Sequence, residues 1–245
     1  MYLPRPRAMR TDAAAEVGPP GSRHMGLSVV VATDGDAAQL GRCLAALAGS
    51  ERRGLELEII VVDPDGGPEL AAIADSQGAA VIQHPGSRGA RLAAGAKAAT
   101  AEWLLLLRAE TVLDRGWDAT IVVFAAEERN RERGGFFPLE VGGAPRASRL
   151  VRWRNRWMGL PSGAQGMVIR RRFLVHLGGI ADLERGEDLV LARALGLARM
   201  VVFDVAARVD AGHWPTGVRA VLLGALRIFL FRLHIPARWL QWLGD

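Results

Sequence analysis

Four short apolar runs, separated by helical patterns, constrain the fold of this chain more than any other feature. We predict buried strands where these runs are continuous and rich in β-branched residues or leucine, over 27–32, 57–63, 79–83 and 103–108. Helical patterns lie between them, over 37–47, up to Gln77 and over 89–100, and Asp34 or Asp36 supplies the first N-cap. Apolar strands that alternate with helices are typical of a parallel sheet covered on both faces. The sequence therefore predicts the α/β class, with a Rossmann-like, mostly parallel central sheet flanked by helices.

The second half of the chain has a less regular pattern. We predict helices over 114–133, 146–160 and 186–196, an edge strand over 134–140, and strands over 167–171 and 200–209. Pro138 places the 134–140 strand at a sheet edge, because proline cannot donate to a central ladder. We divide the chain into a mobile leader (1–25), one α/β domain (26–213) and an amphipathic C-terminal helical segment (214–245).

Composition removes several classes of protein. Half of the 245 residues are hydrophobic, which excludes a disordered chain. The single cysteine, Cys43, excludes an intramolecular disulfide and a cysteine-based zinc site, and its apolar helical context predicts a buried thiol. The net charge of +5 rests on 31 basic residues, of which Lys97 is the one lysine. Arginine suits phosphate ligands, but a GC-rich coding genome produces the same bias, so the charge alone names no partner.

The two ends of the chain bear on its location. Residues 1–25 lack a hydrophobic run, so we expect no signal peptide and a cytoplasmic protein. No run reaches the roughly 18–20 uncharged apolar residues of a spanning helix. The segment 216–243 is apolar but is interrupted by Arg219, Arg227 and Arg232. It is either a helical cover of the domain or an interfacial helix at the inner face of the membrane, and the cost of central arginines disfavours a spanning helix.

Polar side chains follow the predicted strands, at the edge where open α/β sheets bind ligands. They stand in the segments 32–34, 63–65, 84–89 and 108–110. Neither a G-x-G-x-x-G fingerprint nor a Walker A sequence is present, which disfavours a dinucleotide dehydrogenase and a P-loop nucleotidase. The glycine-rich loop before the 89–100 helix could present amides to a phosphate, with Arg88 and Arg91 adding charge. Asp63 either caps its turn or accepts a hydrogen bond from a base or a ribose.

Six segments in unbroken order carry a resemblance to a known family. They read VVVAT (29–33), IIVVD (59–63), HPGSRGARLAAGAKAA (84–99), WLLLLRAET (103–111), GLPSGAQGMVIRR (159–171) and GEDLVLARAL (186–195). Together they resemble a family 2 glycosyltransferase of GT-A fold, in particular the small bacterial branch with R-G-x-Q, H-A-D-T, G-D-Q-G and E-D motifs. The resemblance spans roughly residues 27–235 and marks 26–213 as a GT-A domain.

The resemblance implies transfer of a sugar, with inversion, from a nucleotide-diphosphate sugar to an acceptor that the sequence does not name. The donor contacts that it implies are Thr33, Asp63, Asp65, Arg88, Gly89, Arg91 and Gln165. Glu187 and Asp188 match the catalytic acidic pair, and Asp188 corresponds to the base that removes the acceptor proton. The alternative for this pair is a plain charge at a helix N-terminus. Tryptophans lie near the ends of 214–245. They suggest, as one option, a lipid-linked acceptor and a peripheral contact with the membrane.

The metal motif departs from the family's pattern. Where the family places an acidic motif that ligates Mg²⁺ or Mn²⁺, this chain has Arg108-Ala109-Glu110, and Ala164 replaces the usual aspartate of the G-D-Q-G motif. Three possibilities stay open. Glu110 holds the cation, with His213 as a further ligand; an arginine (Arg88, Arg91 or Arg108) neutralises the diphosphate without metal; or the protein is a catalytically degenerate nucleotide-sugar binder or scaffold.

A rival from another class is an arginine-rich nucleic-acid binder that uses the 146–158 helix, where Arg and Trp interleave. The six segments favour the glycosyltransferase, so we expect no nucleic-acid partner.

Overall fold

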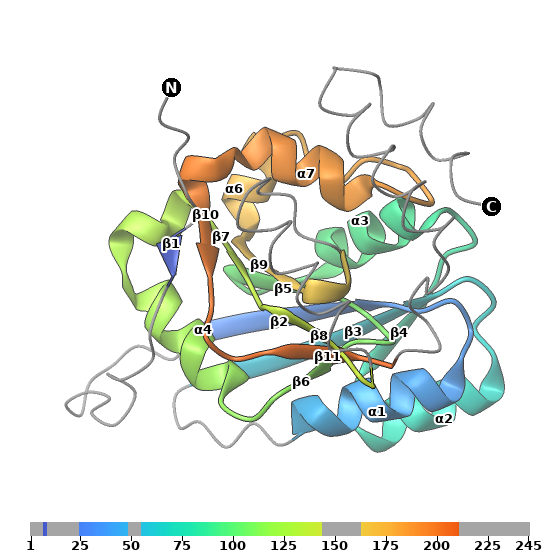
Figure 1. Ribbon diagram of the computed structural model, residues 1–245. Helices are drawn as coiled ribbons and strands as arrows, with labels where there is room; N and C mark the ends of the chain where they lie inside the picture. The colour runs from blue at the N-terminus through green and yellow to red at the C-terminus, as the bar shows by residue number, and fades with distance from the viewer. Residues whose placement is uncertain (1–6, 9–24, 49–54, 144–162, 211–245) are drawn as a thin grey trace.

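The computed structural model describes residues 7–8, 25–48, 55–143 and 163–210. Within these ranges an eight-stranded sheet has the order β1-β10-β7-β9-β5-β2-β3-β4 (Figure 1). Its strands are β1 (Arg7–Ala8), β2 (Met25–Ala32), β3 (Leu55–Asp63), β4 (Ala80–Gln83), β5 (Trp103–Arg108), β7 (Gly134–Phe136), β9 (Met167–Arg170) and β10 (Met200–Val202). β9 is antiparallel to both neighbours and the other pairings are parallel. The predicted α/β class with a mostly parallel central sheet is confirmed.

Helices cover both faces of this sheet (Figure 1). One face packs against α1 (Ala37–Ala48), α2 (Pro68–Ser76) and α4 (Trp117–Ala126), and the other against α3 (Arg88–Ala98), α6 (Arg171–His176) and α7 (Glu187–Leu195). Successive residues of β2 alternate between the two cores: Val29 and Val31 join the first, and Val30 and Ala32 the second. Because both sides of β2 are buried, its sequence is a continuous apolar run rather than an alternating one.

The predicted helix and strand order of the first half is confirmed, with small shifts of the bounds. α1 is capped by Asp36 rather than Asp34, because Asp36 Oδ1 accepts a hydrogen bond of 2.9 Å from the Gln39 amide. α3 starts at Arg88, after Ser87, whose hydroxyl accepts from the Ala90 amide. These shifts leave the polar residues at the strand ends where the sequence placed them.

The predicted edge strand over 134–140 is two strands, and the prediction is wrong for the first of them, since the second lies at the edge of its own sheet. β7 lies inside the sheet, between β10 and β9. The chain leaves that sheet before Pro138 and continues as β8 (Leu139–Val141), which belongs to a second sheet of order β6-β11-β8 with β6 (Val112–Leu113) and β11 (Ala207–Val209). Pro138 therefore sits between two strands, where its missing N–H donor is not needed.

Two other predicted elements are divided. The 114–133 helix ends as α4 at Ala126 and is followed by a 3-10 turn, η1 (Glu128–Glu132). There the Asn130 side-chain amide donates to the Phe124 carbonyl of the last helical turn (2.9 Å). The 200–209 strand becomes β10 and β11, which belong to different sheets. A short 3-10 turn, η3 (Leu197–Arg199), connects α7 to β10.

Parts of the predicted termini and one predicted helix lie outside the described residues. These are residues 1–6 and 9–24 of the leader, the 146–160 helix, His213 and the 214–245 segment. Within the leader, Arg7–Ala8 pairs in parallel with β10, and Met25 begins β2. Among the described helices none combines the length and the hydropathy that a bilayer crossing needs.

Cys43 lies on the buried face of α1 and is 1% exposed. Burial, reinforced by the negative charge of Glu110, raises the pKa of the Cys43 thiol to about 12. The thiol therefore stays protonated and packs as a small apolar side chain, as predicted.

A glycine-to-alanine substitution, which adds one methyl group, tests how closely α3 packs against the sheet. A Cβ atom on Gly95 would lie 2.3 Å from Val30 Cγ1 and 3.0 Å from Val62 Cγ2. We expect Gly95→Ala to lower the free energy of unfolding by about 1–3 kcal/mol, the usual cost of overpacking, in urea denaturation. Gly41→Ala in α1 is the matched control, since its Cβ would meet nothing nearer than Ile73 Cγ2 at 3.9 Å. That variant should keep or gain stability through helix propensity, and an equal gain at Gly95 would contradict the packing.

Candidate functional site

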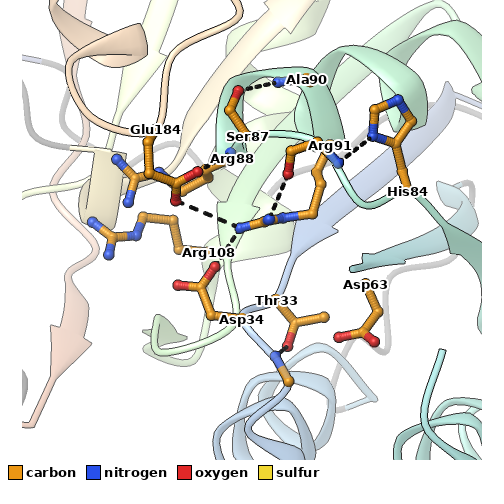
Figure 2. A network of polar contacts seen from close by, with 12 residues as sticks. Thr33, Asp34, Asp63, His84, Ser87, Arg88, Ala90, Arg91, Arg108 and Glu184 are labelled. Carbon is orange, nitrogen blue, oxygen red and sulfur yellow. Dashed lines mark hydrogen bonds and ion pairs between the residues drawn. The ribbon is translucent and has the colours of Figure 1, made fainter. Parts of the chain in front are cut away.

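The candidate site forms where β2, β3 and β5 end together. Ala32 is in register with both Val62 and Arg108. The Thr33 amide then donates to the Val62 carbonyl (3.1 Å), and the Ala109 amide donates to the Ala32 carbonyl (3.0 Å). The polar segments that follow these three strands therefore lie side by side at one edge of the sheet, and Figure 2 shows Thr33, Asp34, Asp63 and Arg108 in one view.

Asp63 is the most deeply buried carboxylate of this edge, with 1% of the residue exposed. Its Oδ2 accepts hydrogen bonds from the amides of Asp65 (3.0 Å) and Gly66 (2.7 Å). Its Oδ1 is buried and has no hydrogen-bond partner among the described residues. The turn thus fixes the carboxylate through one oxygen and leaves the other as an unused acceptor. Thr33 lies beside it, with its hydroxyl accepting from the Gly35 amide (3.0 Å) (Figure 2).

Arg91 of α3 links three segments above this carboxylate. Its Nη1 donates to the Gly86 carbonyl (2.8 Å), and its Nη2 contacts Asp34 and, at 3.9 Å, Glu184 (Figure 2). The Arg91 residue is 5% exposed, and its Nε has no hydrogen-bond partner in the described part of the chain. The side chain therefore holds the β2 end, the 84–87 loop and the 181–186 loop together.

The N-terminus of α3, predicted to receive phosphate, is contacted by the 181–184 loop. The Ser87 hydroxyl bonds Asp182 (2.6 Å), the Arg88 amide donates to Glu184 (3.1 Å), and the Gly89 amide donates to the Leu183 carbonyl (3.0 Å). A Cβ atom on Gly89 would lie 2.0 Å from the Ala181 carbonyl oxygen, so glycine permits this packing. The predicted role of Arg88 and Gly89 at a diphosphate stays a prediction.

Arg88 and Glu187 form a buried, bidentate ion pair between α3 and α7. The Arg88 Nε and Nη2 atoms donate to the two Glu187 carboxylate oxygens at 2.7 and 2.9 Å. The Arg88 side chain is 11% exposed and that of Glu187 is 3% exposed. Burial and the neighbouring Asp188 charge raise the pKa of Glu187, and the Arg88 hydrogen bonds and charge oppose that rise. This pair joins the two halves of the domain.

Asp188, the predicted base, is half-buried at the start of α7. Its Oδ2 accepts from the Gly163 amide (2.6 Å) and its Oδ1 from the Leu189 amide (2.9 Å). A carboxylate offers about four acceptor positions, so these two bonds orient the group and leave positions for a substrate proton. Asp188 lines a concavity together with Arg108, Gly163 and Glu187.

Arg108 and Glu110 form an ion pair at the end of β5. The Arg108 Nη2 atom lies 2.6 Å from Glu110 Oε1, and the two side chains are 26% and 14% exposed. Arg108 Nε is buried and has no hydrogen-bond partner among the described residues. The residue predicted to ligate a metal is thus neutralised by its own neighbour in the motif.

The described residues do not by themselves complete a divalent metal site. Mg²⁺ and Mn²⁺ are held by several oxygen ligands, usually from more than one carboxylate or from substrate phosphate. Within the described ranges no group of three or more His, Cys, Asp or Glu residues could hold a metal ion. The second ligand suggested by the sequence, His213, lies outside those ranges.

Two other predicted contacts have defined positions. Gln165, in the 3-10 turn η2 (Gly163–Gln165), is 2% exposed, and its Nε2 donates to the Phe137 carbonyl (2.8 Å). The Asp65 side chain is exposed, while its amide helps to hold Asp63. The sequence analysis missed the acids of the 181–184 loop, Asp182 and Glu184. Nothing in their local pattern relates them to α3, about 95 residues earlier.

Comparison with known proteins adds a fold-level result. The chain matches no protein-family model and no curated protein sequence. A mannosyltransferase from Pyrobaculum calidifontis, solved with GDP-Man and Mn²⁺, has a TM-score of 0.64 at 17% identity, covering 90% of this chain and 68% of that one. Glucosyl-3-phosphoglycerate synthase from Mycobacterium tuberculosis has a TM-score of 0.60 at 14% identity, covering 96% and 90%.

TarS from S. aureus is a further structural neighbour, with a TM-score of 0.62 at 16% identity. It matches 88% of this chain, which spans 41% of the TarS chain. These neighbours are GT-A-like glycosyltransferases, and at such identities the likeness shows the fold alone. The chain has the mixed α/β architecture of GT-A glycosyltransferase folds.

The Arg88–Glu187 pair has an exposed counterpart with the same geometry, which makes its contribution measurable. Arg208 donates to both oxygens of Asp114 at 2.6 and 2.9 Å, but that arginine side chain is 58% exposed. We expect Glu187→Gln to lower the free energy of unfolding by about 3–5 kcal/mol, because it leaves a buried guanidinium uncompensated. Asp114→Asn should cost about 1 kcal/mol or less. If the two variants lost the same free energy of unfolding in urea denaturation, burial would not set the strength of the Arg88–Glu187 link between α3 and α7.

Proposed function

We propose that this protein is a family 2 glycosyltransferase that moves a sugar, with inversion, from a nucleotide-diphosphate sugar to an acceptor hydroxyl. The observation that carries the proposal is Asp63, a carboxylate fixed by backbone amides whose second oxygen is buried without a partner among the described residues. An unsatisfied buried acceptor costs roughly 1–3 kcal/mol, more for a charged group, so a ligand that donates an N–H or O–H accounts for it. The site lies at the carboxyl ends of the strands, where open α/β sheets bind nucleotides.

In this proposal the nucleoside lies against Thr33, Asp63 and Asp65. A carboxylate at Asp63 accepts hydrogen bonds and does not donate them, so it selects a base edge N–H or a ribose hydroxyl. The donor diphosphate then extends toward Arg91, whose guanidinium contacts Asp34, and toward Arg108 (Figure 2). Guanidinium groups match phosphate oxygens in charge and in geometry.

The transfer step requires a base next to the acceptor. Asp188 is held by the amides of Gly163 and Leu189 and lines the same concavity as Arg108. In the proposed step the acceptor hydroxyl gives its proton to Asp188 while its oxygen attacks the anomeric carbon. Glu187 is engaged by Arg88 on both oxygens, so we assign it to positioning α7 rather than to proton transfer.

The structural neighbour with GDP-Man and Mn²⁺ makes a divalent ion the first expectation for the diphosphate. In this chain Glu110, with His213, would have to hold it together with diphosphate oxygens, and Arg108 competes with the ion for the Glu110 carboxylate. Phosphate neutralisation by arginine is the alternative that needs no metal ligand.

The acceptor side is proposed from the sequence of residues 214–245. Its arginines and tryptophans on an apolar background are typical of an interfacial helix. We propose a peripheral position at the inner face of the membrane and a lipid-linked acceptor. Co-sedimentation of the full chain with anionic vesicles, and its loss in a chain cut after residue 213, tests the position.

A catalytically degenerate nucleotide-sugar binder is the second candidate function. Ala164 stands where the related G-D-Q-G motif carries a carboxylate, and Arg108 pairs with Glu110, the carboxylate that remains in the H-A-D-T position. Both features favour loss of a metal-dependent reaction. Binding of a nucleotide sugar without turnover would support it.

The donor site is tested first by nucleotide binding. We expect at least one nucleoside diphosphate or nucleotide sugar to raise the melting temperature of the full chain, because a ligand of the folded state stabilises it. Asp63→Asn should weaken that ligand about tenfold or more, because the amide presents a donor where the ligand also donates. The exposed Asp75→Asn in α2 is the charge-matched control and should bind as the wild type. No shift with any nucleotide would overturn the proposal.

The base assignment is tested with the ligand found in that way. We expect Asp188→Asn to bind the nucleotide sugar as the wild type does and to release nucleotide about 100-fold more slowly or worse, as loss of a general base predicts. The amide keeps one acceptor for the Gly163 N–H, so the fold should survive. Full turnover in the variant would move the base elsewhere, and no turnover in the wild type would favour the degenerate binder.

A further inference from the structure

We infer that Arg108, in place of a divalent cation, binds the donor diphosphate and stabilises the charge that develops on it as the sugar leaves. The inference rests on the proposed function, since it assumes a nucleotide-diphosphate donor in the site. It assigns Glu110 a different role from the one expected of that position: a counter-ion for Arg108 that an incoming phosphate replaces.

The position of Arg108 brings its guanidinium to the reacting region. Arg108 ends β5 in register with Ala32, one residue before Thr33. Its Cδ lies 3.4 Å from the place of a Cβ on Gly163, whose amide holds Asp188. The arginine therefore stands between the proposed nucleoside contact and the proposed base, where the diphosphate of a bound donor would lie.

Of the three arginines at the site, Arg108 has the fewest competing contacts among the described residues. Arg88 is held on two nitrogens by the buried Glu187. Arg91 is held by the Gly86 carbonyl and Asp34, and its side chain is 6% exposed. Arg108 is held through one nitrogen by Glu110, and its side chain is 26% exposed. It can therefore exchange its partner without loss of a structural link.

The hydrogen bonding of Arg108 is incomplete as it stands. Nη2 pairs with Glu110, whereas the buried Nε has no acceptor in the described part of the chain. A guanidinium binds phosphate best through two parallel N–H donors. Rotation of the Arg108 side chain from Glu110 to a phosphate would let Nε and a terminal nitrogen donate together. The Nε atom, which has no acceptor in the present arrangement, would then have one.

A divalent cation on Glu110 would be unfavourable in the same geometry. The ion would lie next to the Arg108 guanidinium, which already occupies a carboxylate oxygen at 2.6 Å. Two cations that share one carboxylate repel each other, and no further carboxylate completes a three-residue metal group among the described residues. The guanidinium itself supplies the positive charge that the diphosphate needs.

The transfer balances with Arg108 in this role. The acceptor oxygen loses its proton to Asp188 and forms a bond to the anomeric carbon. The bond from that carbon to the diphosphate oxygen breaks, and its electron pair remains on the phosphate. The leaving nucleoside diphosphate gains one negative charge, which the Arg108 donors meet.

Calorimetric titration of the full chain separates the contribution of the diphosphate from that of the nucleoside. The probes are uridine with UDP and guanosine with GDP, each in EDTA and in Mn²⁺. For the base that binds, we expect the diphosphate in EDTA to bind at least about tenfold more tightly than the nucleoside, as charge-assisted hydrogen bonds allow. Mn²⁺ should change that affinity by less than about threefold, because Arg108 already neutralises the phosphate.

The variants assign that gain to Arg108. Arg108→Gln should weaken the diphosphate about tenfold or more and leave the nucleoside unchanged, as loss of charge-assisted bonds requires. Arg170→Gln is the matched control, because Arg170 is 24% exposed and contacts Glu102 at the same 2.6 Å, at the opposite end of β5.

Glu110→Gln should keep or raise diphosphate affinity in EDTA by freeing the guanidinium. Arg108→Lys should retain part of the affinity, since it keeps the charge without the fork.

Two results overturn the inference while leaving the donor site intact. One is a gain in diphosphate affinity of more than about tenfold on addition of Mn²⁺, which Glu110→Gln abolishes, as expected if Glu110 were a metal ligand. The other is unchanged diphosphate affinity in Arg108→Gln. Failure of the wild type to bind any nucleoside or nucleotide overturns the proposed function itself, and the inference with it.

Discussion

β2 is paired in parallel with β3 on one side and with β5 on the other, and this shared register decides where the polar residues lie. Ala32 stands opposite both Val62 and Arg108, so the three strands end at one level. Both faces of β2 are buried in separate cores, and a slip of one residue would exchange its side chains between those cores. The apolar packing of the strand thereby also fixes the distance between Thr33, Asp63 and the end of β5.

Ion pairs then connect this edge to the rest of the domain. Arg88 meets Glu187 from 99 residues later in the chain, and Arg91 meets Asp34 from 57 residues earlier. The first pair is buried and bidentate, so it can act as a fixed link between α3 and α7. The second has an exposed carboxylate, since the Asp34 side chain is 62% exposed, and such pairs contribute little to stability. Arg91 is also held by the Gly86 carbonyl, so Arg88 and Arg91 are both links within the domain, whereas Arg108 has one partner, Glu110, to exchange.

The sequence predicted what depends on local pattern and missed what depends on distant pairing. Continuous apolar runs identified β2, β3 and β5, and the residues after them were expected at one edge for that reason. Residues 134–136 were misassigned to an edge because a local rule about Pro138 cannot reveal that β10 lies outside β7. Gly89 was expected at a phosphate, yet its amide meets the Leu183 carbonyl, a contact that no local pattern encodes. Glu110 was one candidate metal ligand beside the cationic Arg108, and side-chain geometry shows that the two are paired.

Ala164, which replaces the aspartate of the G-D-Q-G motif that the sequence resembles, has a physical account of the same kind. The 163–165 turn acts mainly through its backbone: the Gly163 amide donates to Asp188, and the Ala164 carbonyl accepts from the Thr111 hydroxyl at 3.1 Å. The Ala164 residue is 3% exposed, so a carboxylate there would be buried and would need its own partner. With Arg108 neutralised by Glu110, an apolar side chain at this position leaves no charge unpaired. The apolar side chain at 164 also adds no second negative charge beside the diphosphate that we infer to replace Glu110 on Arg108.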